Sequence, residues 1–572
     1  MTSRLVLGVN IGFHDSSAAL LRGGQLCHLV EQEKVSRRKY ALGQTPALAV
    51  AACLKASGVA AEEVEAVAIG WDYRLLGIAD HPRFRPESLA TMVFGAHVPD
   101  PVPPMRWVPH HLAHAASAYY SCGLDNAAIL VVDGAGESQS ATIAYGHDGH
   151  ISILREWPIA QSLGFLYGGA AQWAGLGEWG AGKLMGLAAY GRARAGFLGR
   201  RLPDGYELTI KVPPGDTVSG RPSRLPSLRF DPALQAATQE MFSCHFPFAQ
   251  RRNEGAIAYA DFAATVQHCL EEAALGLADE AQRLTGADTL VIAGGVGMNC
   301  SMVGRLLRDA PFRRIWLPPV ANDVGVSLGA ALLQASEDKD FAPTALSHPY
   351  WSLGLDEQDA GEAIRAVGLP MRSVAGVLPR VVAAAIASGQ VVGWARGRGE
   401  IGQRALGARS LLADPRDRYS LERLNLLKGR EMWRPAAPSV LAEHVDDVMA
   451  TPVGDPARFM LAAGQVRQAM HQMMPATTHV DGSARPQRVE QAANPAYWAM
   501  IDQFRQLTGV PAVLNTSFNL AGDPIVNTAQ EALDTFVRAD GIDLLVVENL
   551  LVARGEKDLE EALNRLETND VA

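Results

Sequence analysis

Apolar runs of strand length recur in the first part of the chain, and glycines and polar residues follow each of them. The runs are residues 5–10, followed by Gly12, residues 126–132, followed by Asp133 and Gly134, and residues 287–293, followed by Gly294 and Gly295. Runs of this kind predict buried β-strands, and a glycine turn lets backbone N–H groups approach a phosphate. Each turn alone is ordinary for an α/β domain, but three in one chain predict an α/β domain that handles a phosphorylated ligand.

Stretches of helical character alternate with these strands. They cover residues 46–56, 257–284, 325–334 and 379–388, and a strand is predicted over residues 390–394. Lys, Asp, Pro and His interrupt the apolar periodicity at residues 338–351, which predicts a domain boundary. We therefore expect one domain over residues 1–345 and a second over residues 352–572.

Composition narrows the class of protein. The chain has 572 residues, 51 basic and 61 acidic side chains and a net charge of −10, which argues against a nucleic-acid partner held by a general basic surface. Its six cysteines form no CxxC pair, as expected of thiols in a reducing compartment. No apolar run approaches the roughly 18 residues of a membrane span, and no secretory leader pattern stands at the start. We expect a soluble, cytoplasmic protein of open oligomeric state.

Two histidines stand four residues apart. His110 and His114 stand at the start of an alanine-rich stretch, and if residues 112–120 are helical the two side chains lie one turn apart on one face. Two neutral imidazoles so placed can hold one transition-metal ion. The alternatives are a solvated helix N-terminus and a buried hydrogen-bonded pair.

Arginine is concentrated between residues 396 and 434, where it alternates with glycine and alanine. A later strand ends in Asn515, Thr516, Ser517 and Asn519. The guanidinium fork binds phosphate oxygens in pairs, and short hydroxyl and amide groups add donors. This pattern favours a pocket for a small multiply charged anion over a solvated basic face.

Nine stretches together resemble the O-carbamoyltransferases of nodulation-factor and antibiotic biosynthesis, over nearly the whole chain. They are residues 8–20, 31–37, 110–114, 182–191, 294–299, 322–325, 404–416, 479–485 and 514–519. The chain departs from the family pattern at residues 178–182, just before Lys183, and at Gln403, where a proline is expected.

The resemblance implies a fold and an activity. The N-terminal domain would have the actin/sugar-kinase/heat-shock-protein ATPase fold, as in tRNA threonylcarbamoyl transferases, and the C-terminal domain would be a YrdC-like α/β domain. Carbamoyl phosphate would lose its phosphate in the second domain, and the carbamate would attack ATP, supplied with Mg²⁺, to form carbamoyl-adenylate. The first domain would then transfer the carbamoyl group to a hydroxyl. Because carbamate is short-lived in water, a closed basic pocket suits this chemistry.

The resemblance also assigns residues. Those implied to bind carbamoyl phosphate are Arg404, Lys428, Arg434, Arg485, Asn515 and Ser517, with Arg409 as a further candidate; Arg404, Lys428 and Ser517 are also expected to be catalytic. Those implied to bind the metal are His110, His114, Asp133 and Asp323. Their chemistry suits iron(II), zinc or manganese, and the resemblance favours iron(II).

The remaining assignments concern the nucleotide and the acceptor. Residues expected at the nucleotide are Gly134, Lys183, Gly294, Gly295 and Asn299. Those expected at the acceptor are His14, Glu31 and Arg37, with His14 as the catalytic base that removes the hydroxyl proton and Asp15 as its orienting partner or as the base itself. The alternative for His14 is a turn histidine bonded to the backbone.

Three functions compete. The first is ATP-dependent O-carbamoyl transfer to a hydroxyl of a secondary metabolite such as an antibiotic. The second is tRNA threonylcarbamoyl modification, which would favour a basic docking surface. The third is a non-catalytic ATP-binding protein or a metallopeptidase; a peptidase would carry Glu after the first histidine, where this chain has His111. We favour the first.

Overall fold

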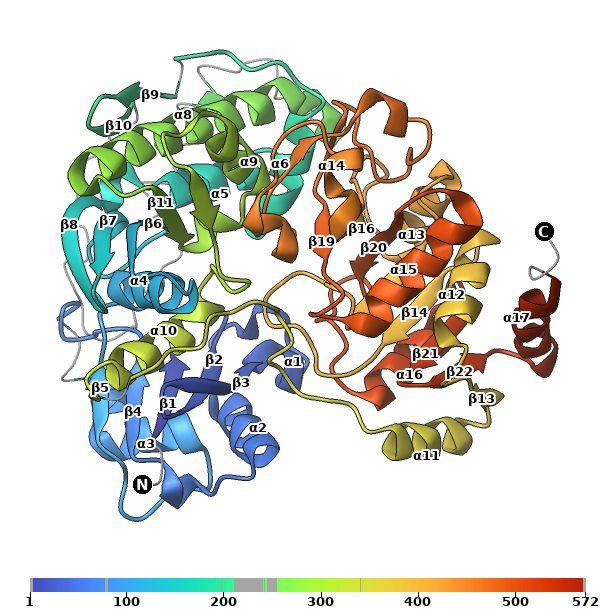
Figure 1. Cartoon of the computed structure of the whole chain (residues 1–572). Helices are drawn as coiled ribbons and strands as arrows, with labels where there is room; N and C mark the ends of the chain where they lie inside the picture. Colours follow the sequence, from blue (N-terminus) through green and yellow to red (C-terminus); the bar gives the residue numbers. More distant parts are fainter. Residues whose placement is uncertain are drawn as a thin grey trace. The chain divides into compact units, whose positions relative to one another are not determined.

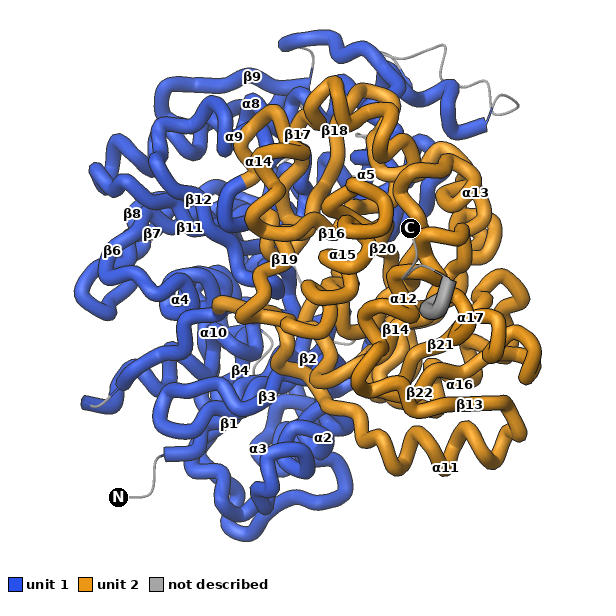
Figure 2. Tube along the Cα trace, turned by 45° about the vertical axis from the view of Figure 1, so that its right-hand side comes forward, with its two compact units in different colours: residues 1–32, 40–346, 454–456 blue, residues 33–39, 347–453, 457–572 orange. Residues whose placement is uncertain are grey.

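The structure is a computed structural model that describes residues 4–77, 81–196, 198–209, 240, 242–243, 255–339 and 341–568. The chain forms two compact units (Figure 2). Unit 1 comprises residues 1–32, 40–346 and 454–456, and unit 2 comprises residues 33–39, 347–453 and 457–572. Each unit therefore includes one short segment from the part of the chain that otherwise builds the other.

Unit 1 contains two five-stranded sheets of the same topology (Figure 1). In sheet order, the first consists of β3 (Gln25–Glu31), β2 (Ser17–Arg22), β1 (Leu5–Asn10), β4 (Ala66–Ile69) and β5 (Met105–Trp107). The second consists of β12 (Arg314–Trp316), β11 (Thr289–Ala293), β6 (Asn126–Val132), β7 (Gln139–His147) and β8 (His150–Pro158). In each sheet an antiparallel meander is followed by two parallel strands. This duplication is the topology of the actin/sugar-kinase/heat-shock-protein ATPase fold and confirms that prediction.

Helices cover these sheets. They are α2 (Ala47–Ser57), α3 (Pro86–Phe94), α4 (His110–Ser121), α5 (Leu163–Trp173), α6 (Ala181–Ala188), α8 (Ala260–Thr285), α9 (Cys300–Asp309) and α10 (Val324–Ala335), with a small β9–β10 hairpin (Gly199–Leu202 and Gly205–Leu208). Helix α10 packs against α4 and β1. A Cβ at Gly329 would lie 1.8 Å from the carbonyl oxygen of Ala113, so the close approach of α4 and α10 requires glycine there.

Unit 2 is built on one eight-stranded mixed sheet. In sheet order its strands are β13 (Met371–Ser373), β22 (Leu550–Ala553), β21 (Leu544–Val547), β14 (Val392–Ala395), β15 (Arg409–Ala413), β20 (Ala512–Ser517), β16 (Ala437–Leu441) and β19 (Gln487–Val489). Its helices are α11 (Glu357–Val367), α12 (Leu378–Ala387), α13 (Arg418–Leu427), α14 (Val445–Val448), α15 (Pro495–Thr508), α16 (Ala529–Arg538) and α17 (Glu556–Thr568). Both units are thus α/β, as predicted.

Burial follows the apolar pattern of the sequence. Every residue of β1, β14 and β21 is buried, because helices cover the sheets and leave these strands no solvent-facing side. The five cysteines within the described residues are free thiols. None of the described helices is long and apolar enough to cross a membrane.

Candidate active sites

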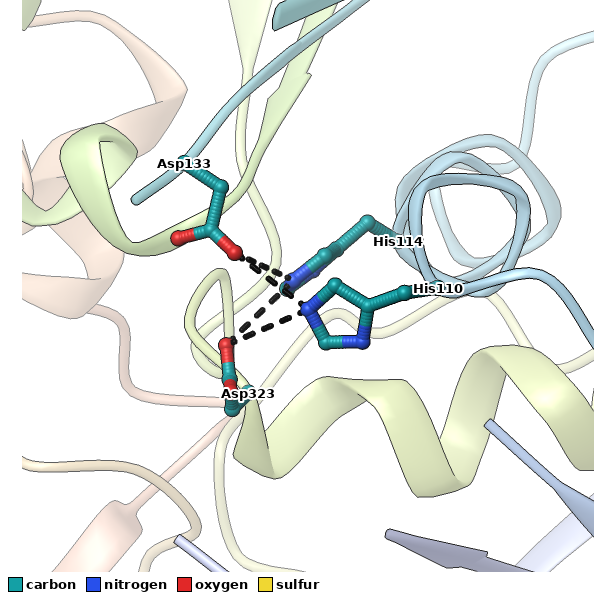
Figure 3. Close-up of side chains that lie close together, drawn as sticks. All are labelled: His110, His114, Asp133 and Asp323. Carbon is teal, nitrogen blue, oxygen red and sulfur yellow. Dashed lines mark hydrogen bonds and ion pairs between the residues drawn. The ribbon is translucent and has the colours of Figure 1, made fainter. Parts of the chain in front are cut away.

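A cluster of two histidines and two aspartates lies at the meeting point of α4, β6 and α10 in unit 1 (Figure 3). Helix α4 begins at His110, so His110 and His114 are one turn apart, and both imidazoles are fully buried. Asp133 directly follows β6 and Asp323 directly precedes α10. The Nε2 atoms of the two histidines lie 3.3 and 3.5 Å from Asp133 Oδ2 and 3.7 and 3.4 Å from Asp323 Oδ1.

The donor set of this cluster fits a divalent transition metal. His110 Nδ1 lies 3.1 Å from the carbonyl oxygen of Gly70 and donates to it, which leaves the Nε2 lone pair directed at the carboxylates. Among the described residues His114 Nδ1 has no hydrogen-bond partner, and His114 Nε2, also buried, faces the two carboxylates. Asp133 Oδ1 accepts the backbone N–H of Gly295 at 2.9 Å, which leaves Oδ2 toward the imidazoles. A cation between the two Nε2 atoms and the two carboxylates would satisfy these facing atoms.

The electrostatics of the cluster also favour the binding of a cation. Burial alone would lower the pKa of His110, but the carboxylates of Asp323 and Asp133 raise it to about 10. The same two carboxylates overcome burial at His114 and raise its pKa. The protein therefore stabilises positive charge between these side chains, and a bound metal ion would replace the protons.

Glu137 supports the histidine pair, and sequence reasoning missed it. Its carboxylate accepts the backbone N–H of His110 through both oxygens, at 2.9 and 3.1 Å, and that of Asp72 at 2.9 Å. A buried carboxylate at the start of α4 satisfies orphan N–H groups and interacts favourably with the helix dipole. The connection from β6 to β7 thus contains both the metal-ligand candidate Asp133 and the group that anchors the first turn of α4.

His14 lies beside the cluster, in the turn after β1. Its Nε2 is 3.9 Å from Asp323 Oδ2 and its Nδ1 is 3.3 Å from Asp15 Oδ2. Asp15 Oδ2 also accepts the Asn322 amide at 3.1 Å, which fixes the carboxylate. The side chain of His14 is 35% exposed, whereas the other imidazoles of the cluster are fully enclosed. It is therefore the cluster's solvent-facing imidazole.

Unit 2 gathers basic side chains around the end of β20. Lys428, directly after α13, is buried, and its ammonium donates to the Ser517 carbonyl oxygen, to Ser517 Oγ at 3.3 Å, and to the Asn519 carbonyl oxygen and Oδ1, both at 2.8 Å. Arg430 Nη1 donates to Thr516 Oγ1 at 3.1 Å. The polar strand end and the basic stretch noted in the sequence are therefore in contact.

Like charges crowd together at this place. Burial, together with the neighbouring Arg430, Lys39 and Arg434, lowers the pKa of Lys428 well below its usual range. Burial, with Arg434 and Arg485 nearby, lowers the pKa of Arg430 as well. We call Lys39, Lys428, Arg430, Arg434 and Arg485 the cationic cluster. Gathering cations where water is excluded is costly, and a bound multivalent anion would offset that cost.

Two other candidates of this site have defined contacts. Asn515 is buried, and its amide donates to the Ala405 carbonyl oxygen at 3.1 Å, so the segment of Arg404 lies beside the end of β20. Arg409 is buried, and its guanidinium donates to backbone carbonyl oxygens, including those of Arg396 at 3.0 Å and Gly397 at 3.1 Å. Arg409 therefore supports the backbone between β14 and β15.

Comparison with known proteins identifies the family. The carbamoyltransferase N-terminus model matches residues 90–332 and the carbamoyltransferase C-terminus model matches residues 383–554. The chain belongs to the carbamoyltransferase family. Nodulation protein NolNO of Sinorhizobium fredii is 35% identical over 565 residues, which cover 95% of this chain and 80% of that protein. Nodulation protein NolO of Bradyrhizobium diazoefficiens is 35% identical over 464 residues, covering 79% and 80%.

Two solved structures each match 59% of this chain. The full-length HypF structure in the phosphate- and nucleotide-bound form covers 59% of this chain and 57% of that chain, with 15% identity and a TM-score of 0.35. Component A of (R)-2-hydroxyglutaryl-CoA dehydratase from Acidaminococcus fermentans covers 59% of this chain and 100% of that chain, with 15% identity and a TM-score of 0.35.

Membership in the carbamoyltransferase family makes the protein a transferase. The alternative of a non-catalytic ATP-binding protein is therefore wrong.

In this carbamoyltransferase, the residues predicted for the nucleotide lie after β6, between β11 and α9, and on α6. Gly294 has φ of 91°, and a Cβ there would lie 2.2 Å from the Val132 carbonyl oxygen. Asn299 caps α9 through the Met302 N–H and exchanges two side-chain hydrogen bonds with Gln267. Gly134 directly follows Asp133, and Lys183 lies on α6. Their roles at a nucleotide stay predictions.

The two remaining acceptor candidates belong to different units. Glu31 is the buried last residue of β3 in unit 1. Arg37 belongs to unit 2, where its guanidinium donates to the carbonyl oxygens of Ile525 at 2.7 Å and Pro524 at 2.9 Å and pairs with Glu531 at 3.0 Å. Their contact with an acceptor stays a prediction. Sequence reasoning assigned no role to Lys39, since its neighbours in the cationic cluster come from a distant segment of the chain. Arg430 belongs to the arginine-rich stretch for which an anion pocket was predicted.

Proposed function

We propose that this carbamoyltransferase is ATP-dependent and works in two steps. Unit 2 would convert carbamoyl phosphate, ATP and one water molecule to carbamoyl-adenylate, phosphate and pyrophosphate. Unit 1 would transfer the carbamoyl group to an alcohol and release AMP. The observation that carries this proposal is the cationic cluster of unit 2, a second charged site besides the histidine–aspartate cluster of unit 1. A transferase with a single reaction centre would need no such group of cations around a buried lysine.

The first substrate of unit 2 would be an anion, carbamoyl phosphate. The arginines of the cationic cluster and Arg404 would bind the phosphate oxygens, with Lys428 and the Ser517 hydroxyl at the bond that breaks. One water molecule would attack the phosphorus of carbamoyl phosphate, breaking its bond to the carbamoyl oxygen and releasing phosphate and carbamate. The carbamate oxygen would then attack the α-phosphorus of ATP and displace pyrophosphate. Negative charge accumulates on the phosphate that leaves carbamoyl phosphate and on the pyrophosphate that leaves ATP. Fixed cations away from water stabilise this charge strongly. The same exclusion of water would protect the carbamate.

In unit 1 the acceptor alcohol must lose a proton as it attacks. His14 is partly exposed and hydrogen-bonded to Asp15, so Asp15 would orient the ring while the imidazole takes the proton. His110, His114, Asp133 and Asp323 would hold the metal, iron(II) by family resemblance, which when bound would polarise the carbamoyl carbonyl and neutralise charge on the adenylate phosphate. We further propose that the acceptor is a secondary-metabolite hydroxyl.

The test of the proposal measures pyrophosphate release from ATP with carbamoyl phosphate and no acceptor. We expect release in the wild type that requires carbamoyl phosphate, and a loss of at least about 100-fold in Lys428→Met, because a charge-assisted contact to a reacting phosphate is removed. Since Lys428 is buried, Ser517→Ala serves as a second variant with a smaller perturbation. Lys55→Met, on the outer face of α2, is the control.

Each result of this experiment either supports or contradicts adenylate formation in unit 2. Pyrophosphate that appears only with carbamoyl phosphate, and falls in both site variants but not in the control, supports adenylate formation in unit 2. Release of ADP and phosphate instead of pyrophosphate, or full activity of Lys428→Met, would contradict it. His14→Ala should still release pyrophosphate and fail only in transfer to the acceptor.

A further inference from the structure

An aromatic side chain that none of the assigned roles uses lies next to His14. Trp179 belongs to the turn between α5 and α6 and is 39% exposed. The ring of Tyr40 stacks on it, with centroids 4.4 Å apart and an interplanar angle of 19°. The imidazole of His14 meets the same indole at 5.1 Å and 78°, an edge-to-face contact. One indole thus touches both a supporting ring and the imidazole proposed as the base.

Tyr40 fixes this arrangement through its backbone as well as its ring. Its carbonyl oxygen accepts the N–H of Asp15 at 2.7 Å, so it holds the turn that contains His14. Tyr40 has φ of 61° and Asp15 has φ of 51°, a left-handed conformation that costs energy in any residue with a Cβ. Strain of this kind persists where the surrounding structure requires it and is common at functional sites. Tyr40 therefore positions both the indole and the turn of His14.

The position of Trp179 suggests what it binds. A half-exposed indole offers a flat apolar surface, and this one directly adjoins a solvent-facing imidazole. We propose that Trp179 is the wall of the acceptor site, on which the apolar face of a ring-bearing alcohol such as a pyranose lies while its hydroxyl reaches His14. This inference rests on the proposed role of His14 as the base. A pyranose presents a rigid face of C–H groups to the indole, which a flexible acyclic polyol does not.

The experiment measures binding of methyl β-D-glucopyranoside and of sorbitol, its acyclic counterpart, by NMR titration of the full-length protein. We expect the glucoside to bind more tightly than sorbitol in the wild type. Trp179→Ala should weaken glucoside binding about fivefold, equivalent to about 1 kcal/mol, and should remove the preference for the ring. Trp179→Phe should retain part of it.

Tyr40 offers a matched pair of variants. Tyr40→Gly accommodates the left-handed backbone but removes the supporting ring, so it should lower glucoside affinity, whereas Tyr40→Phe keeps the stacking and should restore it. Tyr419→Ala removes an exposed aromatic ring from unit 2 and should change nothing. Equal binding of glucoside and sorbitol, or unchanged glucoside binding in Trp179→Ala, would overturn the proposal. Pyrophosphate release in the wild type reports separately on the proposed function.

Discussion

Glu137 provides the sharpest test of how the histidine pair is held. In Glu137→Gln the amide oxygen can retain the two 2.9 Å contacts, to the N–H groups of His110 and Asp72, but the amide NH₂ then lies where the second oxygen is 3.1 Å from the His110 N–H. A charged acceptor contributes about 1.5–3 kcal/mol per hydrogen bond and a neutral one about 0.5–1.5. Two weakened bonds and one donor–donor contact therefore predict a loss of about 2–3 kcal/mol in unfolding free energy.

The same substitution should weaken metal binding, because the first turn of α4 would no longer be held against the β6–β7 connection. Groups that orient metal ligands typically affect metal affinity by about 10- to 100-fold. The assay is a competition titration of Zn²⁺, and of Fe²⁺ without oxygen, against a chromophoric chelator, together with thermal unfolding of the metal-free protein. Glu62→Gln, at an exposed position, is the control. If Glu137→Gln matched the wild type in both metal affinity and unfolding free energy, the supporting role of Glu137 would be refuted.

Two further predictions concern packing and charge. Gly329→Ala should lower the unfolding free energy by at least about 1–3 kcal/mol and weaken metal binding, since the new Cβ would lie 1.8 Å from the Ala113 carbonyl oxygen. Gly182→Ala is the control, because its Cβ meets nothing within 4 Å; it should be neutral or stabilising in the same unfolding assay. Phosphate binding to the cationic cluster, measured by calorimetry, should weaken as the pH rises toward the ordinary lysine pKa of about 10.4. The reason is that burial and neighbouring cations lower the pKa of Lys428, so its charge is lost at a lower pH than usual. The unliganded protein should gain stability over the same rise, since the unfolded chain holds that proton more tightly, and Lys428→Met should show neither effect.

Local patterns in the sequence were sufficient to predict part of the histidine–aspartate cluster. The spacing of His110 and His114 places both on one helical face, because the α-helix repeats every 3.6 residues whatever surrounds it. The apolar runs of β1, β6 and β11 predicted buried strands for a similar reason, since burial on both sides demands apolar side chains throughout. Asp133 and Asp323 are far apart in the sequence, and only the family resemblance linked them to the histidines.

Tertiary structure alone decided the rest. Glu137 caps α4 from another element, and its own neighbourhood in the sequence carries no capping pattern that involves His110. Lys39 joins the cationic cluster through a segment of the N-terminal part of the chain that belongs to unit 2. The contact between Trp179 and Tyr40 likewise joins two loops that are distant in the sequence. Periodicity reports which face of an element is buried, whereas contacts between elements depend on how the whole chain packs, and that information is spread over many residues at once.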